Sequence, residues 1–257
     1  YFPTDLTEVE SVSSTLESVY DDSAAADMAK RMGKAEDAEY FAKRADFYKN
    51  LFDKETKFMR PRNSNGTWKT PFDPSEVAHA ESRGGDYTEG NAWQYTWHVQ
   101  HDVPGLIELF GGDKPFLERL NQFFVNNDSM GDEASADITG LIGQYAHGNE
   151  PSHHISYMYA YAGQQWKTAE KVRYIMDEFY KDTPDGIIGN EDCGQMSAWY
   201  ILSSMGFYQM NPADGVYVFG SPRFDKMSVK VRGGKTFTVE AENNSKENIY
   251  IQKVFLN

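Results

Sequence analysis

The spacing of apolar side chains is the feature of this sequence that most constrains its fold. Small and apolar residues recur every three or four positions from Leu16 to Ala29 and again from Ala38 to Phe52, which places them on one face of a helix. Gly33 separates the two stretches, so they predict a pair of antiparallel helices. The same spacing predicts further helices over residues 89–99, 103–110, 113–126, 140–144, 151–162, 165–180 and 191–205.

Loops rich in glycine and proline separate these helices, and the longest runs from Asp53 to Gly85. A loop of that length in a compact domain is usually functional or wrongly assigned as a loop. About nine helices in antiparallel pairs favour either a bundle or a toroid of helical hairpins, in which loops at one end of the ring carry the chemistry. A complete (α/α)6 toroid of six hairpins needs roughly twelve helices, so we expect this chain to form part of such a ring.

The sequence pattern changes after Gly206. Apolar residues then alternate with polar ones, which predicts strands over residues 215–220, 227–231, 236–241 and 249–255. We therefore expect a mainly α fold in two parts. A helical portion covers residues 1–212, with its boundary near Pro212, and a short β-rich C-terminal segment covers residues 213–257.

Charge and hydropathy argue against two classes of partner. The 257 residues include 25 Lys and Arg against 39 Asp and Glu, a formal net charge of -14, and no stretch concentrates basic residues. Nucleic acid is therefore not an expected partner. No apolar run approaches the roughly 20 residues that cross a bilayer, so we expect no membrane insertion. Aromatic residues make up 14% of the chain, which fits a sugar site as well as a tyrosine-rich helical core.

Three junctions between a loop and a helix share glycine, asparagine, carboxylate and aromatic residues. The first runs from Gly84 to Trp97 and contains Glu89. Aromatic neighbours lower the local dielectric constant and raise the pKa of a carboxyl group, which is what a general acid needs. A glutamate at the start of a helix can also simply complement the helix dipole. The residues alone leave both interpretations of Glu89 open.

The second junction, residues 143–154, packs three histidines, an asparagine and a glutamate together. Histidine beside a carboxylate suits zinc, whereas Asn149 and Glu150 with backbone carbonyls suit an oxygen-seeking cation such as calcium better. Buried capping groups are the alternative.

The third junction, residues 185–200, contains Asp192, which could face a ligand or act as an N-cap. Its neighbour Cys193 is expected to be structural.

Five ordered motifs resemble one known family. In chain order they are Thr15-Leu16-Glu17 with Tyr20-Asp21-Asp22; Glu89-Gly90-Asn91-Ala92-Trp93-Gln94-Tyr95 with His101-Asp102-Val103-Pro104-Gly105-Leu106; Gly148 to His154; Asp192 to Tyr200; and Gly220-Ser221-Pro222 with Phe224-Asp225. This series is similar to that of the family 92 glycoside hydrolases, the calcium-dependent exo-acting α-mannosidases. The resemblance covers nearly the whole chain.

The resemblance implies an inverting glycosidase that releases mannose from mannose-containing oligosaccharides or N-glycans. In inverting glycosidases a general acid and a general base stand roughly 6.5–9.5 Å apart, on opposite sides of the anomeric carbon. Matched motif by motif, Glu89 takes the place of the acid and Asp192 that of the base. The calcium ion of the family binds sugar hydroxyls as well as protein.

The remaining site residues are carried over from the same motifs. Asn149 and Glu150 are expected in the neighbourhood of the calcium ion. The expected substrate contacts are Trp93, His153, His154 and Asn190. Family members often have an acidic residue at the position of Asn190, two residues before the base, so Asp192 is expected to receive less help in activating water.

Length is the main departure from the family. Family members carry an N-terminal β-sandwich and the first helices of the (α/α)6 barrel ahead of the matched region, and the sandwich forms part of the active-site wall. This chain resembles the later part of such an enzyme, and the missing β-sandwich of the parent protein is an expected partner. The alternative is a catalytically incomplete fragment that only binds carbohydrate or has a structural role. A third interpretation is another inverting glycosidase with the same barrel fold. The resemblance also implies export, to the periplasm or the cell exterior.

Overall fold

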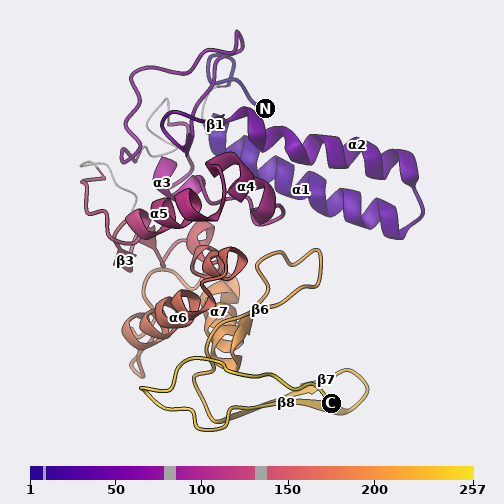
Figure 1. The fold of residues 1–257 in the computed structure, drawn as a ribbon, viewed down its shortest axis with the longest axis vertical. Coiled ribbons are helices and arrows are strands. Elements are labelled where there is room, and N and C mark those ends of the chain that lie inside the picture. The colour runs from indigo at the N-terminus through magenta and orange to yellow at the C-terminus, as the bar shows by residue number, and fades with distance from the viewer. Residues whose placement is uncertain (8–9, 78–84, 131–137) are drawn as a thin grey trace. The chain divides into compact units, whose positions relative to one another are not determined.

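The computed structural model describes residues 1–7, 10–77, 85–130 and 138–257 (Figure 1). It is helix-rich, with 41% of it helical and a few small sheets, which confirms the mainly α fold. The chain forms two compact units. The first unit consists of Tyr1–Ser152 with Asn211–Gly215, and the second of His153–Met210 with Val216–Asn257. The toroidal arrangement and the boundary at residue 212 stay predictions.

The first unit opens with the expected pair of helices. α1 (Ser11–Arg31) and α2 (Ala35–Ala45) lie side by side (Figure 1). Gly33 between them has a φ of 73°, a left-handed conformation that glycine adopts without steric cost. α2 continues into a 3-10 turn, η1 (Asp46–Asn50), in which Tyr48 is fully buried.

A segment distant in sequence caps the start of α1. The first N–H groups of a helix have no partner within that helix. Here the N–H of Glu10 donates to the carbonyl of Gly85 at 2.6 Å. The N–H groups of Val12 and Ser13 donate to the carbonyl of Asp86 at 3.0 and 3.3 Å. These bonds hold the loop that precedes α3 against the end of α1.

Aromatic rings fill the core around α3 (Ala92–Tyr95), α4 (Val103–Phe110) and α5 (Asp113–Phe123). Trp97 is fully buried and stacks on Phe110, with 5.6 Å between the ring centroids and 5° between the planes. Such pairs add to the stabilisation that burial of the rings already gives. The core therefore stiffens the segment that carries Glu89 into α3.

Several of the expected helices are shorter than the spacing predicts, among them the one expected over 191–205, whose α-helical part begins at Gln195. The helix expected over residues 89–99 is reduced to α3, because Glu89 has a φ of 46° and cannot lie within a right-handed helix. The helix expected over 113–126 ends at Phe123. Within the long stretch between α2 and α3, β1 (Phe52–Asp53) pairs antiparallel with β2 (Phe58–Met59).

The helix expected over residues 140–144 is wrong. The chain forms a tight antiparallel hairpin there, in which β3 (Leu141–Ile142) pairs with β4 (Tyr145–Ala146). Gly140 and Gly143 have φ values of 63° and 61°, which reverse the chain and exclude a right-handed helix. A Cβ atom on Gly143 would lie 2.6 Å from the carbonyl oxygen of Phe123, so the close approach to α5 requires glycine.

The helix expected over residues 151–162 forms as two 3-10 segments, η2 (Glu150–Ser152) and η3 (Ile155–Ala162). α6 (Gln165–Phe179) follows η3, and η4 (Asp192–Gly194) leads into α7 (Gln195–Met205). The core of the second unit lies among η3, α6 and α7. Its fully buried large side chains include Tyr157, Tyr159, Met196 and Trp199.

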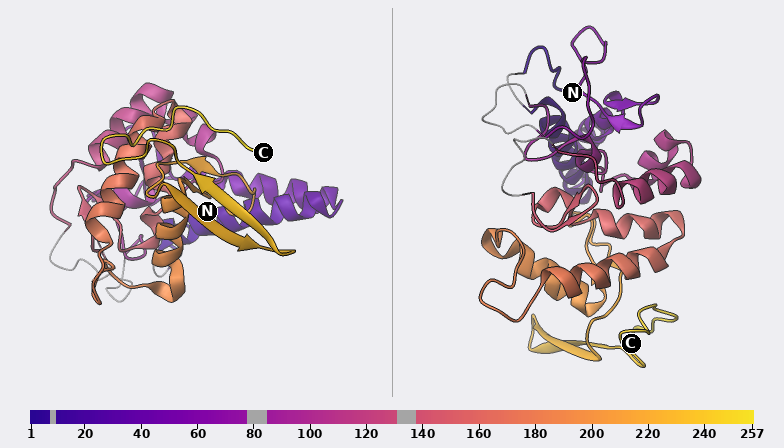
Figure 2. Two further views of the ribbon diagram at one scale, coloured as in Figure 1. Left: turned by 90° about the horizontal axis from the view of Figure 1, so that it is seen from below. Right: turned by 90° about the vertical axis from the view of Figure 1, so that its left-hand side faces the viewer.

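The end of the second unit contains the expected change to strands. β5 (Phe207–Tyr208) pairs with β6 (Val218–Phe219), and β7 (Lys226–Val231) pairs antiparallel with β8 (Lys235–Glu240), the hairpin of long arrows in Figure 2. The strand expected over 249–255 is wrong, because that segment pairs with no strand in the described part of the chain.

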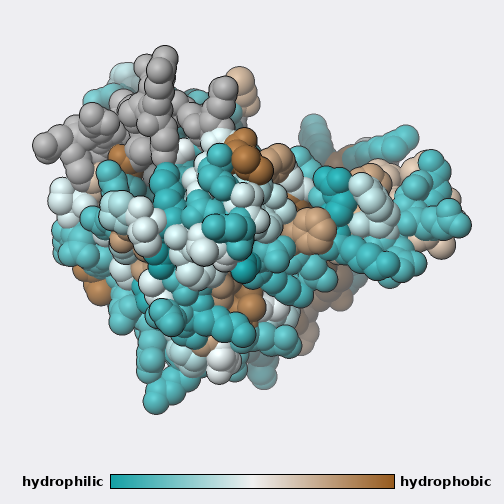
Figure 3. Space-filling view, turned by 90° about the horizontal axis from the view of Figure 1, so that it is seen from above, coloured by the Kyte–Doolittle hydropathy of each residue, from teal (hydrophilic) through white to brown (hydrophobic). Residues whose placement is uncertain are grey.

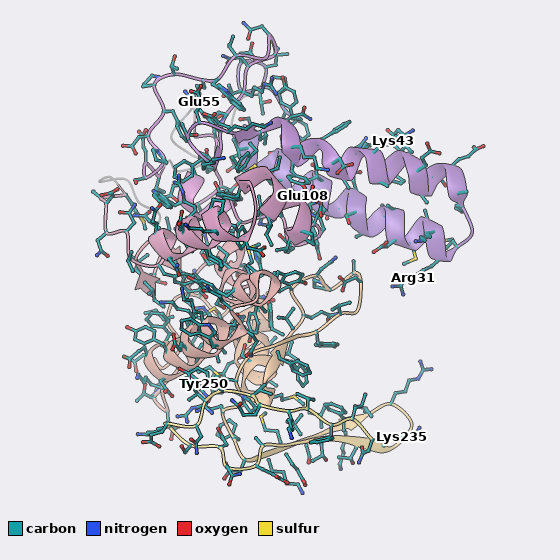
Figure 4. The ribbon with its side chains drawn as sticks, viewed as in Figure 1. Arg31, Lys43, Glu55, Glu108, Lys235 and Tyr250 are labelled. Carbon is teal, nitrogen blue, oxygen red and sulfur yellow. The ribbon has the colours of Figure 1, made fainter. Side chains whose placement is uncertain are left out.

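One face of the molecule is largely polar. Hydrophilic side chains cover most of the face seen in Figure 3, and apolar ones lie scattered among them. Lys43 projects from α2 (Figure 4) and pairs with Glu39 at 2.7 Å. Within the described ranges, every helix is too short or too polar to cross a membrane.

Candidate active site

Glu89 lies in the first unit, in the turn that leads into α3. It is partly exposed and its backbone is left-handed, with a φ of 46°. The chain is held one residue before Glu89 and at the carbonyl group of Glu89 itself. The N–H of Thr88 donates to Oγ of Ser13 at 2.7 Å, and Nδ2 of Asn149 donates to the carbonyl oxygen of Glu89 at 2.9 Å. The turn is therefore anchored to α1 on one side and to the loop before η2 on the other.

Buried amide side chains fix the start of α3. Asn91 and Gln94 form a capping box, in which each side chain accepts a hydrogen bond from the backbone N–H of the other, at 3.1 and 3.3 Å. Nδ2 of Asn91 donates to Oε1 of Gln144 at 2.9 Å, and Nε2 of Gln94 donates to the Gln144 carbonyl at 3.0 Å. Because buried amides are costly to leave unpaired, these bonds hold the Glu89 turn and the following loop in one arrangement.

Trp93, an expected substrate contact, is 8% exposed. Its indole N–H donates to Oγ of Ser75 at 3.2 Å. The ring meets Phe58 edge-on, with 4.8 Å between centroids, and the Arg119 guanidinium lies 5.0 Å from its centroid. In the first unit, the indole thus packs against the β1–β2 hairpin and α5. Its contact with substrate stays a prediction.

Asn149 and Glu150, the expected calcium neighbours, stand at the start of η2. Asn149 is 5% exposed and Glu150 is half-buried. Because Nδ2 of Asn149 is used on Glu89, Oδ1 is the atom of this side chain that could bind a cation. Adjacent amide and carboxylate oxygens fit calcium in ligand type. Among the described residues, no group of three or more His, Cys, Asp or Glu is placed to hold a metal ion.

Asp192 lies in the second unit, at the turn before α7. Asp192, Cys193 and Gly194 have φ values of 49°, 58° and 99°, so three successive residues are left-handed. Both Asp192 and Asn190 are exposed. Asp192 is not the N-cap of α7, because that position belongs to Gly194. The carboxylate of Glu191 accepts the N–H of Ser197 at 2.9 Å instead.

His153 and His154 line the interior of the second unit. His153 is 2% exposed, and its Nδ1 hydrogen-bonds with Nε2 of Gln195 at 3.1 Å. Its carbonyl accepts the indole N–H of Trp199 at 3.0 Å. His154 is 6% exposed. His153 is therefore joined to the first turn of α7, directly after the segment that carries Asp192, whereas sugar contacts by either histidine stay predictions.

The structure thus brings Glu89 and Asn149 together in the first unit, and His153 and the start of α7 together in the second. Sequence reasoning missed Ser13 and Gln144. Ser13 lies 75 positions from its partner Thr88, and as a small polar residue at the start of α1 it resembles an ordinary helix-start residue. Gln144 lies inside the second polar junction, residues 143–154, and the polar composition of that junction is the sequence signal that could have pointed to it.

Comparison with known proteins identifies the family. The family model described as the glycosyl hydrolase family 92 catalytic domain matches residues 1–257. The chain belongs to this family. A relative described as an uncharacterized secreted glycosidase, from Arthroderma benhamiae, is 33% identical over 267 residues, which cover 96% of this chain and 32% of that protein.

Solved structures of family 92 members are similar to the chain in fold. A family 92 α-mannosidase of Bacteroides thetaiotaomicron in complex with mannoimidazole superposes with a TM-score of 0.91 at 44% identity, over 97% of this chain and 33% of that one. A family 92 inverting mannosidase of the same organism gives a TM-score of 0.81 at 38% identity, over 95% and 33%. This family 92 chain therefore spans about a third of the length of these relatives.

Proposed function

We propose that this chain carries the two catalytic carboxylates of an inverting, exo-acting α-mannosidase that releases mannose from glycans. The observation that carries the proposal is the similarity to two family 92 mannosidases along nearly all of the chain, at 44% and 38% identity. One of them is described as inverting, and the other was solved with mannoimidazole. A mannose-containing oligosaccharide or N-glycan is the corresponding substrate.

The proposed reaction is a single displacement at the anomeric carbon. Asp192 removes a proton from a water molecule, whose oxygen attacks the anomeric carbon while the glycosidic C–O bond breaks. Glu89 donates its proton to the departing oxygen, so the leaving sugar departs as a neutral alcohol. The product is β-mannose. After this step Asp192 carries a proton and Glu89 has lost one, and proton exchange with solvent restores both groups before the next turnover.

Two features of the site support these roles. The chain is held at the N–H of Thr88 and at the carbonyl of Glu89, which helps a proton donor to stay within reach of one oxygen atom. Asp192 is exposed and is not the N-cap residue of α7. Asn190 stands where relatives often have an acid, and we propose that it, Trp93, His153 and His154 contact the sugar or support such contacts.

The first test removes each carboxylate in turn. In the whole protein, Glu89→Gln and Asp192→Asn should each lower hydrolysis of an α-mannobioside by at least about a hundredfold, because each variant loses one proton transfer. Glu191→Gln, next to Asp192 and bonded to the backbone of α7, is the control and should keep most of the activity. Wild-type turnover by either carboxylate variant would remove that residue from the mechanism.

We further propose that calcium binds at the loop before η2, with Asn149 and Glu150 as protein ligands. When bound, the ion would ligate sugar hydroxyls and favour a distorted mannose ring. Chelation by EDTA should abolish mannoside hydrolysis, calcium should restore it, and Glu150→Gln should raise the calcium concentration needed for half-maximal activity. Activity that responds to neither EDTA nor calcium would refute the calcium assignment.

The whole protein is proposed to include a β-sandwich upstream of these residues and to be exported, as the description of the fungal relative suggests.

The second candidate function follows from the coverage of about a third of the relatives' length. On that view the chain alone is a catalytically incomplete, carbohydrate-binding or structural portion. Mannose binding without turnover by the isolated chain favours this alternative, and turnover by the isolated chain defeats it. Preferential cleavage of α-glucosides would instead indicate another inverting glycosidase.

A further inference from the structure

The backbone conformation of Glu89 needs external support. A left-handed conformation is unfavourable for a residue with a side chain, and such residues persist where the surrounding structure imposes them. Glu89 has a φ of 46°, and its turn is held at the Tyr87–Thr88 peptide group and at the Glu89–Gly90 peptide group. A Cβ atom on the next residue, Gly90, would lie 2.7 Å from Oε1 of Gln94, so the turn has little room to adopt another path.

Ser13 on α1 supplies the support on one side. It is 1% exposed, and its Oγ accepts the N–H of Thr88 at 2.7 Å. Tyr95 is itself 1% exposed; burial raises the pKa of its hydroxyl, and the nearby side chains of Ser13 and Thr88 act the other way. The Ser13 hydroxyl, buried beside Tyr95, therefore holds the Tyr87–Thr88 peptide group, one residue before Glu89.

The position of Ser13 relative to the turn is fixed by further contacts. The carbonyl of Asp86 accepts the N–H of Ser13, and Oδ1 of Asp86 accepts the hydroxyls of Ser11 and Thr4, each at 2.6 Å. Lys69 pairs with the other carboxylate oxygen, Oδ2, at 2.5 Å. The start of α1 and the loop before Glu89 thus form one connected structure.

We propose that Ser13 is a positioning residue for the general acid. Its hydroxyl fixes the Tyr87–Thr88 peptide, one residue before Glu89, and so sets the direction in which the Glu89 carboxyl group leaves the turn. The inference rests on the proposed function, which assigns the acid role to Glu89. A proton donor acts only within hydrogen-bond reach of the leaving oxygen, so a rotated peptide would weaken proton transfer and leave water activation unchanged.

The test compares two leaving groups in the whole protein. A dinitrophenolate leaves without protonation, whereas the sugar alcohol of an α-mannobioside needs the acid. Ser13→Ala should lower kcat/KM for the mannobioside at least about tenfold more than for dinitrophenyl α-mannoside. Ser13→Thr, which keeps the oxygen, should restore most of that loss.

Thr15→Val is the matched control. Thr15 is also 1% exposed and also lies on α1, but its hydroxyl bonds the backbone of Ser11 and Phe2 instead of the turn. This variant should affect both substrates equally. If Ser13→Ala does not fold, Tyr95→Phe, which removes the hydroxyl that lies beside the Ser13 side chain, should give the same selective loss on a smaller scale.

Glu89→Gln separates the two possible failures. It should lose activity on the mannobioside far more than on the dinitrophenyl substrate, and equal loss would defeat the acid assignment itself. Suppose that Glu89→Gln is selective, but Ser13→Ala, or Tyr95→Phe in its place, lowers kcat/KM equally for both substrates or for neither. Ser13 then has a structural role only, and the positioning inference is wrong.

Discussion

At the scale of single residues, the proposed chemistry depends on backbone conformations that few residues adopt. Glu89 and Asp192 have φ values of 46° and 49°, and each such residue costs about 1–3 kcal/mol. Glycine, asparagine and acid side chains in the sequence predict the two loop-to-helix junctions that carry them. The left-handed backbone of Glu89 could not be predicted, because its supports, Ser13 and Asn149, make contacts that span 75 and 60 positions.

His101 shows how a buried titratable residue affects stability. Its Nε2 lies 3.2 Å from the carbonyl oxygen of Ala45, and its ring meets Tyr48 edge-on at 5.5 Å. Burial lowers the pKa of His101 from its ordinary value of 6.5, although the bond to Ala45 and the nearby Asp102 act the other way. The folded chain therefore keeps this ring neutral at a pH where the unfolded chain protonates it.

This shift predicts a stability that depends on pH. The contribution of His101 is fully present above the unfolded pKa and is lost as the pH falls from there through the folded pKa. The free energy of unfolding, measured with urea at pH 7.5 and pH 5, should therefore fall more in the wild type than in His101→Gln. Equal losses of unfolding free energy in the two proteins would show that His101 does not contribute to the pH dependence of stability.

At the scale of elements, the sequence predicts those helices whose apolar periodicity is long. α1, α2, α4, α6 and α7 lie where the spacing puts them. The failures at 140–144 and 249–255 have tertiary causes. Gly143 turns there because it meets the backbone of α5, and the backbone carbonyl of Ile249 accepts the Ser221 hydroxyl instead of joining a strand.

Arg173 connects α6 to the segments around the C-terminal strands. The residue is 5% exposed, and its Nε donates to Oγ of Ser221 at 2.9 Å. Its other nitrogens bond the carbonyls of Pro222 and Ser245 and the side chain of Asn244. Close to this contact, Tyr250 (Figure 4) donates to Glu170 of α6 at 2.8 Å. The guanidinium therefore satisfies several groups that water reaches poorly.

Replacement of this guanidinium should destabilise the second unit. Arg173→Gln should lower the free energy of unfolding by about 2–4 kcal/mol, because the buried Ser221 hydroxyl and several part-buried acceptors lose a charged donor. Arg223→Gln is the control: Arg223 pairs with Asp177 at 3.0 Å, but the two side chains are 33% and 45% exposed, so the loss should be about 0–1 kcal/mol. Equal losses in a urea titration would contradict the role of Arg173.

At the scale of the whole molecule, each compact unit carries one of the two proposed catalytic carboxylates, Glu89 in the first and Asp192 in the second. The mainly α fold and the family could be predicted from the sequence, because helical spacing and five ordered motifs extend over nearly the whole chain. The distance between the two carboxyl groups could not be predicted from the sequence, because it depends on how segments far apart in the chain are assembled.

The most direct test of the central claim is a crystal structure of the whole protein with a bound mannose-like inhibitor such as mannoimidazole. We expect the Glu89 and Asp192 carboxyl groups on opposite sides of the anomeric carbon, roughly 6.5–9.5 Å apart, with room for one water molecule beside Asp192. Carboxyl groups that open into separate pockets, or that stand about 5 Å apart as in retaining enzymes, would contradict the account.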